Sequence, residues 1–600
     1  MTIQKVTERS VRRKETIMKK HSIARAAVTA GLTIAMSLGG ALGPATMAFA
    51  AEGDNTIKIE NVQGNKTNFK GYQIFKATVT DGTDGKTVSN ITWASDAVKT
   101  AVQNYITNYE TNHSKTYTGT TAQDAADWIK ANVTGTTKET AVNADSVAEG
   151  LAKAVMDITT ETTVTGNTQS GALDPGYWLF LTDGSTVNAG SSTEAGETYT
   201  SPIFAVVGGS TYTVTEKASV PTVEKKIVSD ADSKEHDAAD SHIGQNVTYN
   251  IYGTVAQDFA TYDSYSYKFT DTISKGLTID TDAKGVPSNV KVYMYANSGV
   301  AKADVLHSSD SKVDVTNYFT SGVTDGTNGA HVLTVTAKTT DGAKGLKSIS
   351  GVDKDSCFVV TYTAKINSSA VIGNNGNPNT VYLEYSNNPN GEGTGRTVDH
   401  KVKDFTYGLH LVKVDQGTEQ ALAGAKFTIK VSSADDTASV GKYVQSDGKL
   451  DDAAYEFITG TDGTIDVTGL DTGTYEVEEI SAPSGYTAVP KFSFTISPTI
   501  DEQSQTITEL DSNLSTTDAD HVKAGLIDPS STKGDNVLQI TDNSGVTDKK
   551  TVNITVGDKK SVGLPLTGQA GVTLTWVAGG LVLAFGVSRV VRNRRENDAE

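Results

Sequence analysis

The sequence predicts a mainly β protein, in which an α+β domain precedes two tandem β-sandwich domains. Six hundred residues are enough for several hydrophobic cores. Thr, Val, Tyr and Gly are abundant, and polar and apolar residues alternate at 212–215 and 492–496, which is typical of antiparallel strands. Apolar residues at helical spacing occur mainly at 122–131 and 147–156, so we expect helices chiefly in the first domain.

Two changes in composition predict the domain boundaries. Ser-Val-Pro at 219–221 follows one predicted strand, and the Asn- and Gly-rich segment 387–396 follows another. The predicted segments are a signal peptide at 1–50, an N-terminal α+β module at 51–218, a β-sandwich at 219–402, a second β-sandwich at 403–563, and a C-terminal sorting segment at 564–600.

Charge and cysteine content exclude several classes of function. The formal net charge is −19, the wrong sign for a protein that must neutralise phosphates, so we expect no nucleic-acid partner. The single cysteine, Cys357, rules out an intramolecular disulfide framework and any multi-thiolate metal site, and its apolar neighbours indicate a small core residue. Neither a metal site nor a cofactor is predicted, and no enzyme motif occurs in a supporting context.

The N-terminal segment has the three parts of a secretory signal. Lys19, Lys20 and Arg25 precede an apolar stretch at 26–42, and Ala-Phe-Ala at 48–50 supplies a cleavage site. The alternative, a short membrane anchor, is disfavoured by the glycines in the stretch. We therefore expect export from the cell.

The C-terminal segment combines a short motif, an apolar run at 570–587 and an arginine-rich tail, in which the run would span a membrane. Together these parts resemble the cell-wall sorting signal of Gram-positive surface proteins. The resemblance implies that a sortase cleaves after the threonine of the motif and transfers its carbonyl to an amine. The motif consists of Leu564, Pro565, Leu566, Thr567 and Gly568.

The interior carries further recognisable segments. Leu-Val-Lys-Val-Asp at 411–415, Leu-Ala-Gly-Ala-Lys-Phe at 422–427 and the segment 473–486 resemble the B-type repeat domain of collagen adhesins and pilins. The segments 221–226 and 379–389 are similar to the middle domain of sortase-assembled pilus backbone subunits. The resemblance implies tandem Ig-like sandwiches in a major pilin.

Strand periodicity places a lysine and acids in each predicted sandwich core. Alternate residues of a strand share a face, so Lys225 lies with Val223 and Ile227, and Lys413 with Leu409 and Leu411. The same argument predicts that four further polar side chains face the core and that Asn553 faces away from its apolar neighbours. The four inward-facing residues are Asp271, Asn379, Glu479 and Asp558.

Burial makes these groups reactive. It lowers the pKa of a lysine and raises that of a carboxylic acid, which favours a neutral, nucleophilic amine and a protonated acid. The product would be an isopeptide crosslink that needs no cysteine. The alternative is an ordinary salt bridge made by a lysine that reaches the surface.

The pilin resemblance assigns the roles. It implies a Lys225–Asn379 bond promoted by Asp271 in the middle module. In the last module it implies that Lys413 forms a bond with the help of Glu479. The acceptor there is Asp558, because strand parity favours it. Asn553 is the alternative, because the acceptor in the family is usually an asparagine.

Polymerising pilins also present a lysine to the sortase, in a Tyr-Pro-Lys type motif. At the matching place this sequence has Lys217, preceded by Thr215 and Glu216 rather than Tyr-Pro. Strand parity puts Lys217 on a polar, exposed face, where the alternative is an ordinary solvated lysine. We predict that Lys217 is the acceptor lysine.

These features predict a structural backbone subunit of a wall-anchored pilus that supports adhesion, and not an enzyme. The expected partners are other pilin subunits, a class C pilus sortase, a housekeeping sortase, peptidoglycan and a host-surface ligand. The expected location is the Gram-positive cell wall and surface pilus, after a transient membrane-held stage. The alternative is a monomeric wall-anchored adhesin or minor pilin.

Overall fold

A computed structural model describes residues 54–61, 65–82, 85–133, 146–158, 162–187, 198–216, 218–339, 342–389, 391–517, 522–526 and 551–561. They form two compact units. The first comprises residues up to 371, 376–405 and 500–506, and the second comprises 372–375, 406–499 and 507 onward. The first unit holds the predicted N-terminal and middle modules, and the second holds most of the predicted last module. The fold is mainly β, as the sequence predicts.

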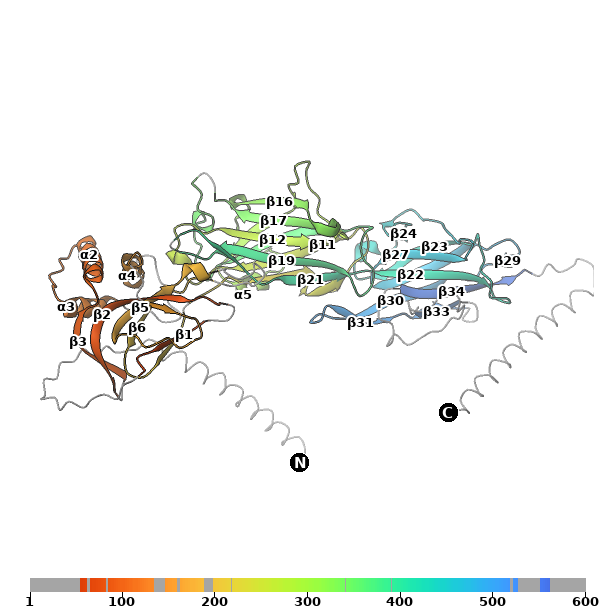
Figure 1. The fold of residues 1–600 in the computed structure, drawn as a ribbon. Coiled ribbons are helices and arrows are strands. Elements are labelled where there is room, and N and C mark those ends of the chain that lie inside the picture. The colour runs from red at the N-terminus through yellow and green to blue at the C-terminus, as the bar shows by residue number, and fades with distance from the viewer. Residues whose placement is uncertain are drawn as a thin grey trace, which may run out of the picture. The chain divides into compact units, whose positions relative to one another are not determined.

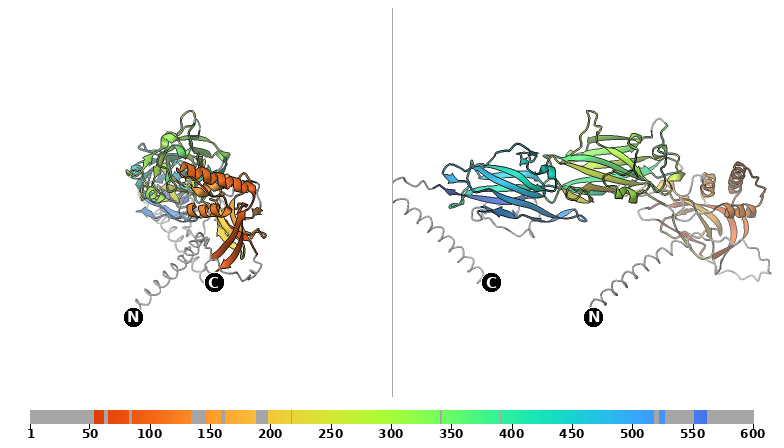
Figure 2. Two further views of the ribbon diagram at one scale, coloured as in Figure 1. Left: turned by 90° about the vertical axis from the view of Figure 1, so that its left-hand side faces the viewer. Right: turned by 180° about the vertical axis from the view of Figure 1, so that it is seen from behind.

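The N-terminal module is a sheet with helices on one face (Figures 1 and 2). The strand order is β3-β2-β5-β6, with β4 beside β2, and a separate parallel pair is formed by β1 and β7. The strands are β1 Ile57–Glu60, β2 Phe69–Gly82, β3 Gly85–Trp93, β4 Thr162–Val164, β5 Gly176–Thr182, β6 Ile203–Val207 and β7 Tyr212–Thr215.

Three helices cover this sheet, and the sequence predicted two of them. The predicted helices at 122–131 and 147–156 are confirmed as α3 Ala122–Asn132 and α4 Val147–Val155. The sequence analysis missed α2 Asp96–Asn112. The Ser95 side chain caps α2 by accepting a hydrogen bond from the Val98 amide at 3.2 Å.

The middle module consists of two seven-stranded sheets. One has the order β15-β14-β18-β11-β8-β9 with β13 beside β18, and the other has the order β10-β21-β19-β12-β17-β16 with β20 beside β19. The first sheet contains β8 Val223–Val228, β9 Glu235–His236, β11 Asn246–Thr254, β13 Leu277–Thr278, β14 Lys291–Tyr295, β15 Val313–Asp314 and β18 Cys357–Ile366. The second contains β10 Ala238–Asp240, β12 Tyr267–Ile273, β16 Phe319–Asp325, β17 His331–Ala337, β19 Asn377–Ser386, β20 Thr394–Arg396 and β21 His400–Phe405.

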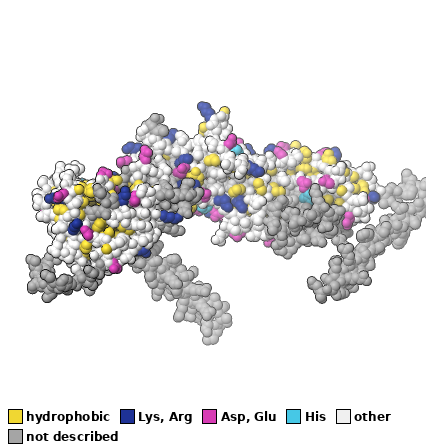
Figure 3. Space-filling view, viewed as in Figure 1, with side chains coloured by type: hydrophobic (Ala, Val, Ile, Leu, Met, Phe, Trp, Pro, Cys, Tyr) yellow, Lys and Arg dark blue, Asp and Glu magenta, His cyan; other side chains and the backbone are white. Residues whose placement is uncertain are grey.

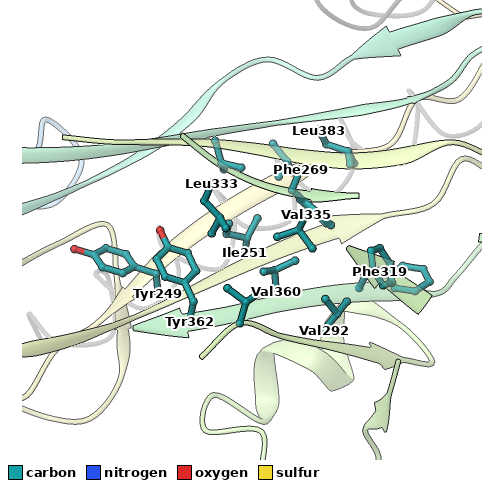
Figure 4. Close-up of a cluster of buried hydrophobic side chains, with 14 of the residues drawn as sticks. Tyr249, Ile251, Phe269, Val292, Phe319, Leu333, Val335, Val360, Tyr362 and Leu383 are labelled. Carbon is teal, nitrogen blue, oxygen red and sulfur yellow. The ribbon is translucent and has the colours of Figure 1, made fainter. Parts of the chain in front are cut away.

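A single apolar core joins the two sheets of this module. Ile251 and Val360 of the first sheet pack with Phe269, Leu333 and Leu383 of the second (Figure 4). A short helix, α5 Ser298–Ala303, lies beside the first sheet. As predicted, Cys357 is a small core residue, since it is fully buried in a cluster with Tyr252, Tyr295, Ala301 and Val359.

The last module also has two sheets. The first has the order β27-β22-β34-β29 with β33 beside β34, and the second has the order β25-β24-β23-β28-β30-β31 with β26 beside β23 and β32 beside β30. The first sheet contains β22 Tyr407–Asp415, β27 Thr464–Leu470, β29 Tyr486–Thr487, β33 Val522–Leu526 and β34 Thr551–Lys560. The second contains β23 Lys426–Ala434, β24 Tyr443–Val444, β25 Leu450–Asp451, β26 Phe457–Ile458, β28 Gly473–Ser481, β30 Phe492–Asp501, β31 Thr506–Asp511 and β32 Leu514–Thr516.

Several predicted features lie outside the described residues. These are the signal peptide, Lys217, the sorting motif at 564–568 and the apolar run at 570–587. Among the residues that the structure describes, no helix is long and apolar enough to cross a membrane. On the visible face, Lys and Arg side chains are interspersed with Asp and Glu (Figure 3).

Candidate functional site: two buried lysine clusters

Lys225 is an inward-facing residue of β8. Burial alternates along this strand, so that Val223, Lys225 and Ile227 face the core while their neighbours are partly exposed. The Lys225 side chain has no exposed surface. An ionised amine at such a position costs several kcal/mol unless it is paired, so its neighbours decide its chemistry.

Those neighbours come from both sheets of the middle module. Asp271 of β12 forms an ion pair with the Lys225 Nζ through its Oδ2. Tyr362 of β18 receives a hydrogen bond from the same Nζ at 2.9 Å and donates one to Asp271 Oδ2 at 2.7 Å. Asn379 of β19 donates from its Nδ2 to the Tyr362 hydroxyl at 2.6 Å. The predicted lysine, acid and amide therefore meet around one tyrosine hydroxyl.

Strand pairing explains why these groups meet. β12 and β19 are adjacent antiparallel strands, in which Ile273 is opposite Asn379 and Asp271 is opposite Val381. Lys225 approaches from the facing sheet. A bond between Lys225 and Asn379 would therefore connect the two sheets of the sandwich.

The environment shifts both ionisable groups toward their neutral forms. Burial lowers the pKa of Lys225 to about 8, although the nearby Asp271 opposes the shift. Burial also raises the pKa of Asp271, against the effects of Lys225 and Tyr362. The Asp271 Oδ1 and the Asn379 Oδ1 are buried and have no hydrogen-bond partner in the part of the chain that the structure describes. A neutral amine next to a protonated acid and a carboxamide is the arrangement that acyl transfer to the amine requires.

The last module has a second cluster, centred on Lys413. Lys413 of β22 contacts Asp558 Oδ1 of β34 and lies 2.8 Å from Glu479 Oε2 of β28, and none of the three side chains is exposed. β22 and β34 are parallel neighbours, with Lys413 opposite Val556 and Asp415 opposite Asp558.

Two acids share this second site. Glu479 Oε2 also accepts a hydrogen bond from the Val489 amide at 3.0 Å, while Glu479 Oε1 and Asp558 Oδ2 are buried without a hydrogen-bond partner within the described ranges. Burial raises the pKa of Asp558 to about 7, against the effect of Lys413 and with a further contribution from Glu479. One acid can therefore be protonated while the other orients the amine.

Asn553, the alternative acceptor, occupies a different place. It lies on β34 opposite His410 and Gly525, in the strand positions between the inward-facing Val552 and Ile554. Both polar atoms of its amide are buried, and no described residue forms a hydrogen bond with them. Among the described residues, Lys413 forms its ion pairs with Asp558 and Glu479, and no hydrogen bond joins it to the Asn553 amide.

Lys217 follows an anchored residue. Glu216 is buried, its backbone amide bonds to the Glu60 carbonyl at 2.9 Å, and its Oε1 accepts a hydrogen bond from Asn65 Nδ2 at 2.8 Å. The preceding strand β7 buries Val214 and exposes Thr213 and Thr215. The position of Lys217 itself lies outside the described residues.

The sequence analysis missed the tyrosines of the first cluster. Tyr362 shares the buried face of β18 with Val360 and Ala364, so its position could be predicted but not its partners. Tyr249 of β11 stacks on Tyr362, with ring centroids 5.4 Å apart and ring planes at 22°. The Lys225 Nζ lies 5.2 Å and 5.1 Å from the centroids of Tyr249 and Tyr362.

The last module of the chain matches a known domain family. Residues 408–511 match the SpaA prealbumin-like fold domain. The trypsin-resistant surface T6 protein of Streptococcus pyogenes serotype M6 is 24% identical over 288 residues, which cover 45% of this chain and 44% of that protein. The match thus spans less than half the length of this curated relative.

Solved structures of two major pilins are among the matches. The T6 backbone pilin of Streptococcus pyogenes is matched over 84% of this chain and 98% of that one, with 16% identity and a TM-score of 0.43. The full-length major pilin SpaD of Corynebacterium diphtheriae is matched over 85% and 98%, with 16% identity and a TM-score of 0.40. The last module therefore matches a prealbumin-like domain, and part of the chain is similar to a streptococcal surface protein, in agreement with the predicted resemblance.

Proposed function

We propose that the chain is the structural backbone subunit of a covalently polymerised, wall-anchored pilus and does not act as an enzyme. The observation that carries the proposal is the pair of fully buried lysines, each in contact with a buried acid and next to a potential acceptor. Such sites suit a protein that must hold its fold under load without disulfides. Similarity to the T6 surface protein supports the same role.

In the middle module, the neutral Lys225 amine attacks the side-chain carbonyl carbon of Asn379. Protonated Asp271 promotes the attack through Tyr362, whose hydroxyl contacts all three groups. The new Nζ–Cγ bond replaces the Cγ–Nδ2 bond, one proton passes from Nζ to Nδ2, and ammonia leaves.

In the last module, Lys413 attacks the side-chain carbon of Asp558, while Glu479 is the promoting acid. The Nζ–Cγ bond forms, one carboxyl oxygen leaves as water, and Glu479 carries a proton between them. The contact between Lys413 and Asp558 favours this acceptor over Asn553.

Between subunits, a class C pilus sortase cleaves after Thr567 and joins its carbonyl to Lys217 of the next subunit. A housekeeping sortase attaches the finished polymer to peptidoglycan. The exposed pilus then presents a surface for adhesion, with a host-surface ligand as its partner. A monomeric wall-anchored adhesin or minor pilin is the alternative, and it differs by using Thr567 without Lys217.

Intact-mass measurement of the purified chain tests the internal bonds and their acceptors. We expect the mature chain to be lighter than its sequence by one ammonia and one water. Asp558→Ala should restore the mass of the water and leave the ammonia loss, because only the second bond is removed. Asn553→Ala should retain both losses. A folded wild-type chain of unshifted mass, or loss of the second bond in Asn553→Ala alone, would contradict the assignment.

Bond formation in the last module should depend on pH. Because the pKa of Asp558 is raised to about 7, its carboxyl is protonated below this pH and ionised above it. Only the protonated carboxyl releases water readily, so in chains whose Lys413 amine is neutral the rate should fall as folding is carried out at increasing pH above about 7, with a limit of about tenfold per pH unit. Mass spectra of chain folded at pH 6 and pH 9 measure this, and equal rates at the two pH values would contradict it.

A further inference from the structure

A second buried acid, Asp404, lies beside the crosslink site of the middle module. It belongs to β21, which pairs with β19 so that Asp404 is opposite Asn377 and Val402 is opposite Asn379. Directly paired residues project from the same face of a sheet, so Asp404 shares the inner face with Asn379 and is its diagonal neighbour. The Asp404 side chain has no exposed surface.

Asp404 has polar contacts, but within the described part of the chain it forms no ion pair with a basic side chain that would explain its burial. Its Oδ2 accepts hydrogen bonds from Ser241 Oγ at 3.3 Å and from the Tyr249 hydroxyl at 3.5 Å, while its Oδ1 has no hydrogen-bond partner among the described residues. Burial raises the pKa of Asp404 well above its usual range, and the charges of Asp240 and Asp230 raise it further, against the hydrogen bonds from Ser241 and Tyr249. Burial therefore favours the uncharged form of Asp404, in a core where an apolar residue would be less costly.

Tyr249 connects this acid to the crosslink site. Its ring stacks on that of Tyr362, and the two lie side by side in the core (Figure 4). Burial raises the pKa of Tyr249, the charges of Asp404 and Asp271 raise it further, and the Asn379 amide lowers it. Tyr249 thus contacts both Asp404 and Tyr362, the tyrosine whose hydroxyl accepts a hydrogen bond from Asn379 Nδ2.

We propose that Asp404 and Tyr249 form a second acid–tyrosine pair that orients the Asn379 amide for attack by Lys225. The first pair is Asp271 and Tyr362. This inference rests on the proposed Lys225–Asn379 bond and adds Asp404 as a positioning residue that acts through Tyr249.

The hydrogen-bond directions support this role. One N–H of Asn379 Nδ2 is used by the Tyr362 oxygen at 2.6 Å. When the Tyr249 hydroxyl donates its proton to Asp404, its oxygen is left to accept from the second N–H. The nitrogen that must leave as ammonia then lies between two tyrosine oxygens, and the amide carbon is held toward Lys225. The reaction itself is unchanged: Nζ–Cγ forms, Cγ–Nδ2 breaks, and the proton from Nζ leaves with the ammonia.

The test is the rate at which the Lys225–Asn379 bond forms in newly made full-length chain. Cell-free synthesis is stopped in acid at set times, and mass spectrometry of the digested chain measures the crosslinked peptide. We expect Tyr249→Phe and Asp404→Leu to slow bond formation about tenfold or more, since misplacement by about 1 Å can cost that much. Asp404→Asn retains an acceptor for the Tyr249 proton and should stay within about threefold of wild type.

Controls separate positioning from a general loss of packing. Ser241→Ala removes a contact to the same carboxyl oxygen without changing Tyr249, so its rate should equal that of wild type. Thermal unfolding of each variant in a Lys225→Ala background shows that it folds without the bond. The Lys413–Asp558 bond in the same samples reports folding of the chain.

Two results would overturn the inference. One is a wild-type rate in both Tyr249→Phe and Asp404→Leu. The other is an equal loss of rate in Asp404→Asn and Asp404→Leu. This would show that the rate depends on the proton of Asp404 and not on its hydrogen bond with Tyr249. Absence of the bond in the wild-type chain would instead refute the proposed crosslink itself.

Discussion

Lys225→Ala is expected to abolish the bond of the middle module and to lower its stability sharply. The bond closes a loop from residue 225 to residue 379, and the chain-entropy treatment of crosslinks gives about 5 kcal/mol for a loop of this length. For a module of this size that corresponds to a fall of about 10–20 °C in Tm. The variant also leaves Asp271 buried without its lysine, which adds to the loss.

Calorimetry together with intact mass measures this effect, and the chain offers a matched control. Lys226, the next residue of β8, is 21% exposed and forms surface ion pairs with Asp237 at 2.8 Å and Glu224 at 3.3 Å. Lys226→Ala should cost less than about 1 kcal/mol and retain the ammonia loss. Equal Tm values for the two variants would show that Lys225 makes an ordinary ion pair.

Lys217→Arg is expected to abolish the covalent polymer while leaving the subunit folded. Arginine keeps the positive charge, but its guanidinium remains protonated and cannot attack the sortase-bound Thr567 carbonyl. In a host with a matching class C sortase, immunoblots of wall extracts should change from a high-mass ladder to a single subunit band.

The neighbouring strand supplies the control for this experiment. Lys58 of β1 is opposite Thr213 of β7, has a side chain that is 36% exposed and forms an ion pair with Glu60 at 2.9 Å. Lys58→Arg should retain the ladder. A ladder that persists in Lys217→Arg would point to another acceptor, and a wild-type chain that gives only one wall-linked band would favour the monomeric adhesin.

Helix α2 was not predicted from the sequence, because intrinsic helix propensity alone does not identify it. α2 contains several Tyr, Thr and Asn residues, which are weak helix formers, so its composition does not stand out from the surrounding β segments. Its apolar residues Val98, Val102 and Ile106 are nevertheless four apart, and they pack in the same core as Ile74 and Leu179 of the sheet. Tertiary packing, together with the Ser95 cap, stabilises a helix that local preference leaves undecided.

For the candidate sites, strand periodicity predicted which side chains face the core, but it did not predict which of them contact one another. Alternation along single strands was enough to predict that Lys225, Lys413 and Asp558 face the core, because side chains of a strand alternate between faces. It could not predict that Tyr362 lies among Lys225, Asp271 and Asn379, since these residues come from four strands in two sheets.

The sequence by itself determined the mainly β class, the inward-facing lysines and acids, and the end segments that resemble export and sorting signals. These are local properties, which depend on the period of a strand or on a short motif. Only the tertiary structure decided which acids contact each lysine. It shows that Lys413 forms an ion pair with Asp558, the first choice of acceptor over Asn553, and that Asp404 accepts a hydrogen bond from Tyr249. Such contacts depend on the register between strands and on how two sheets face each other, and residues far apart in the chain fix both.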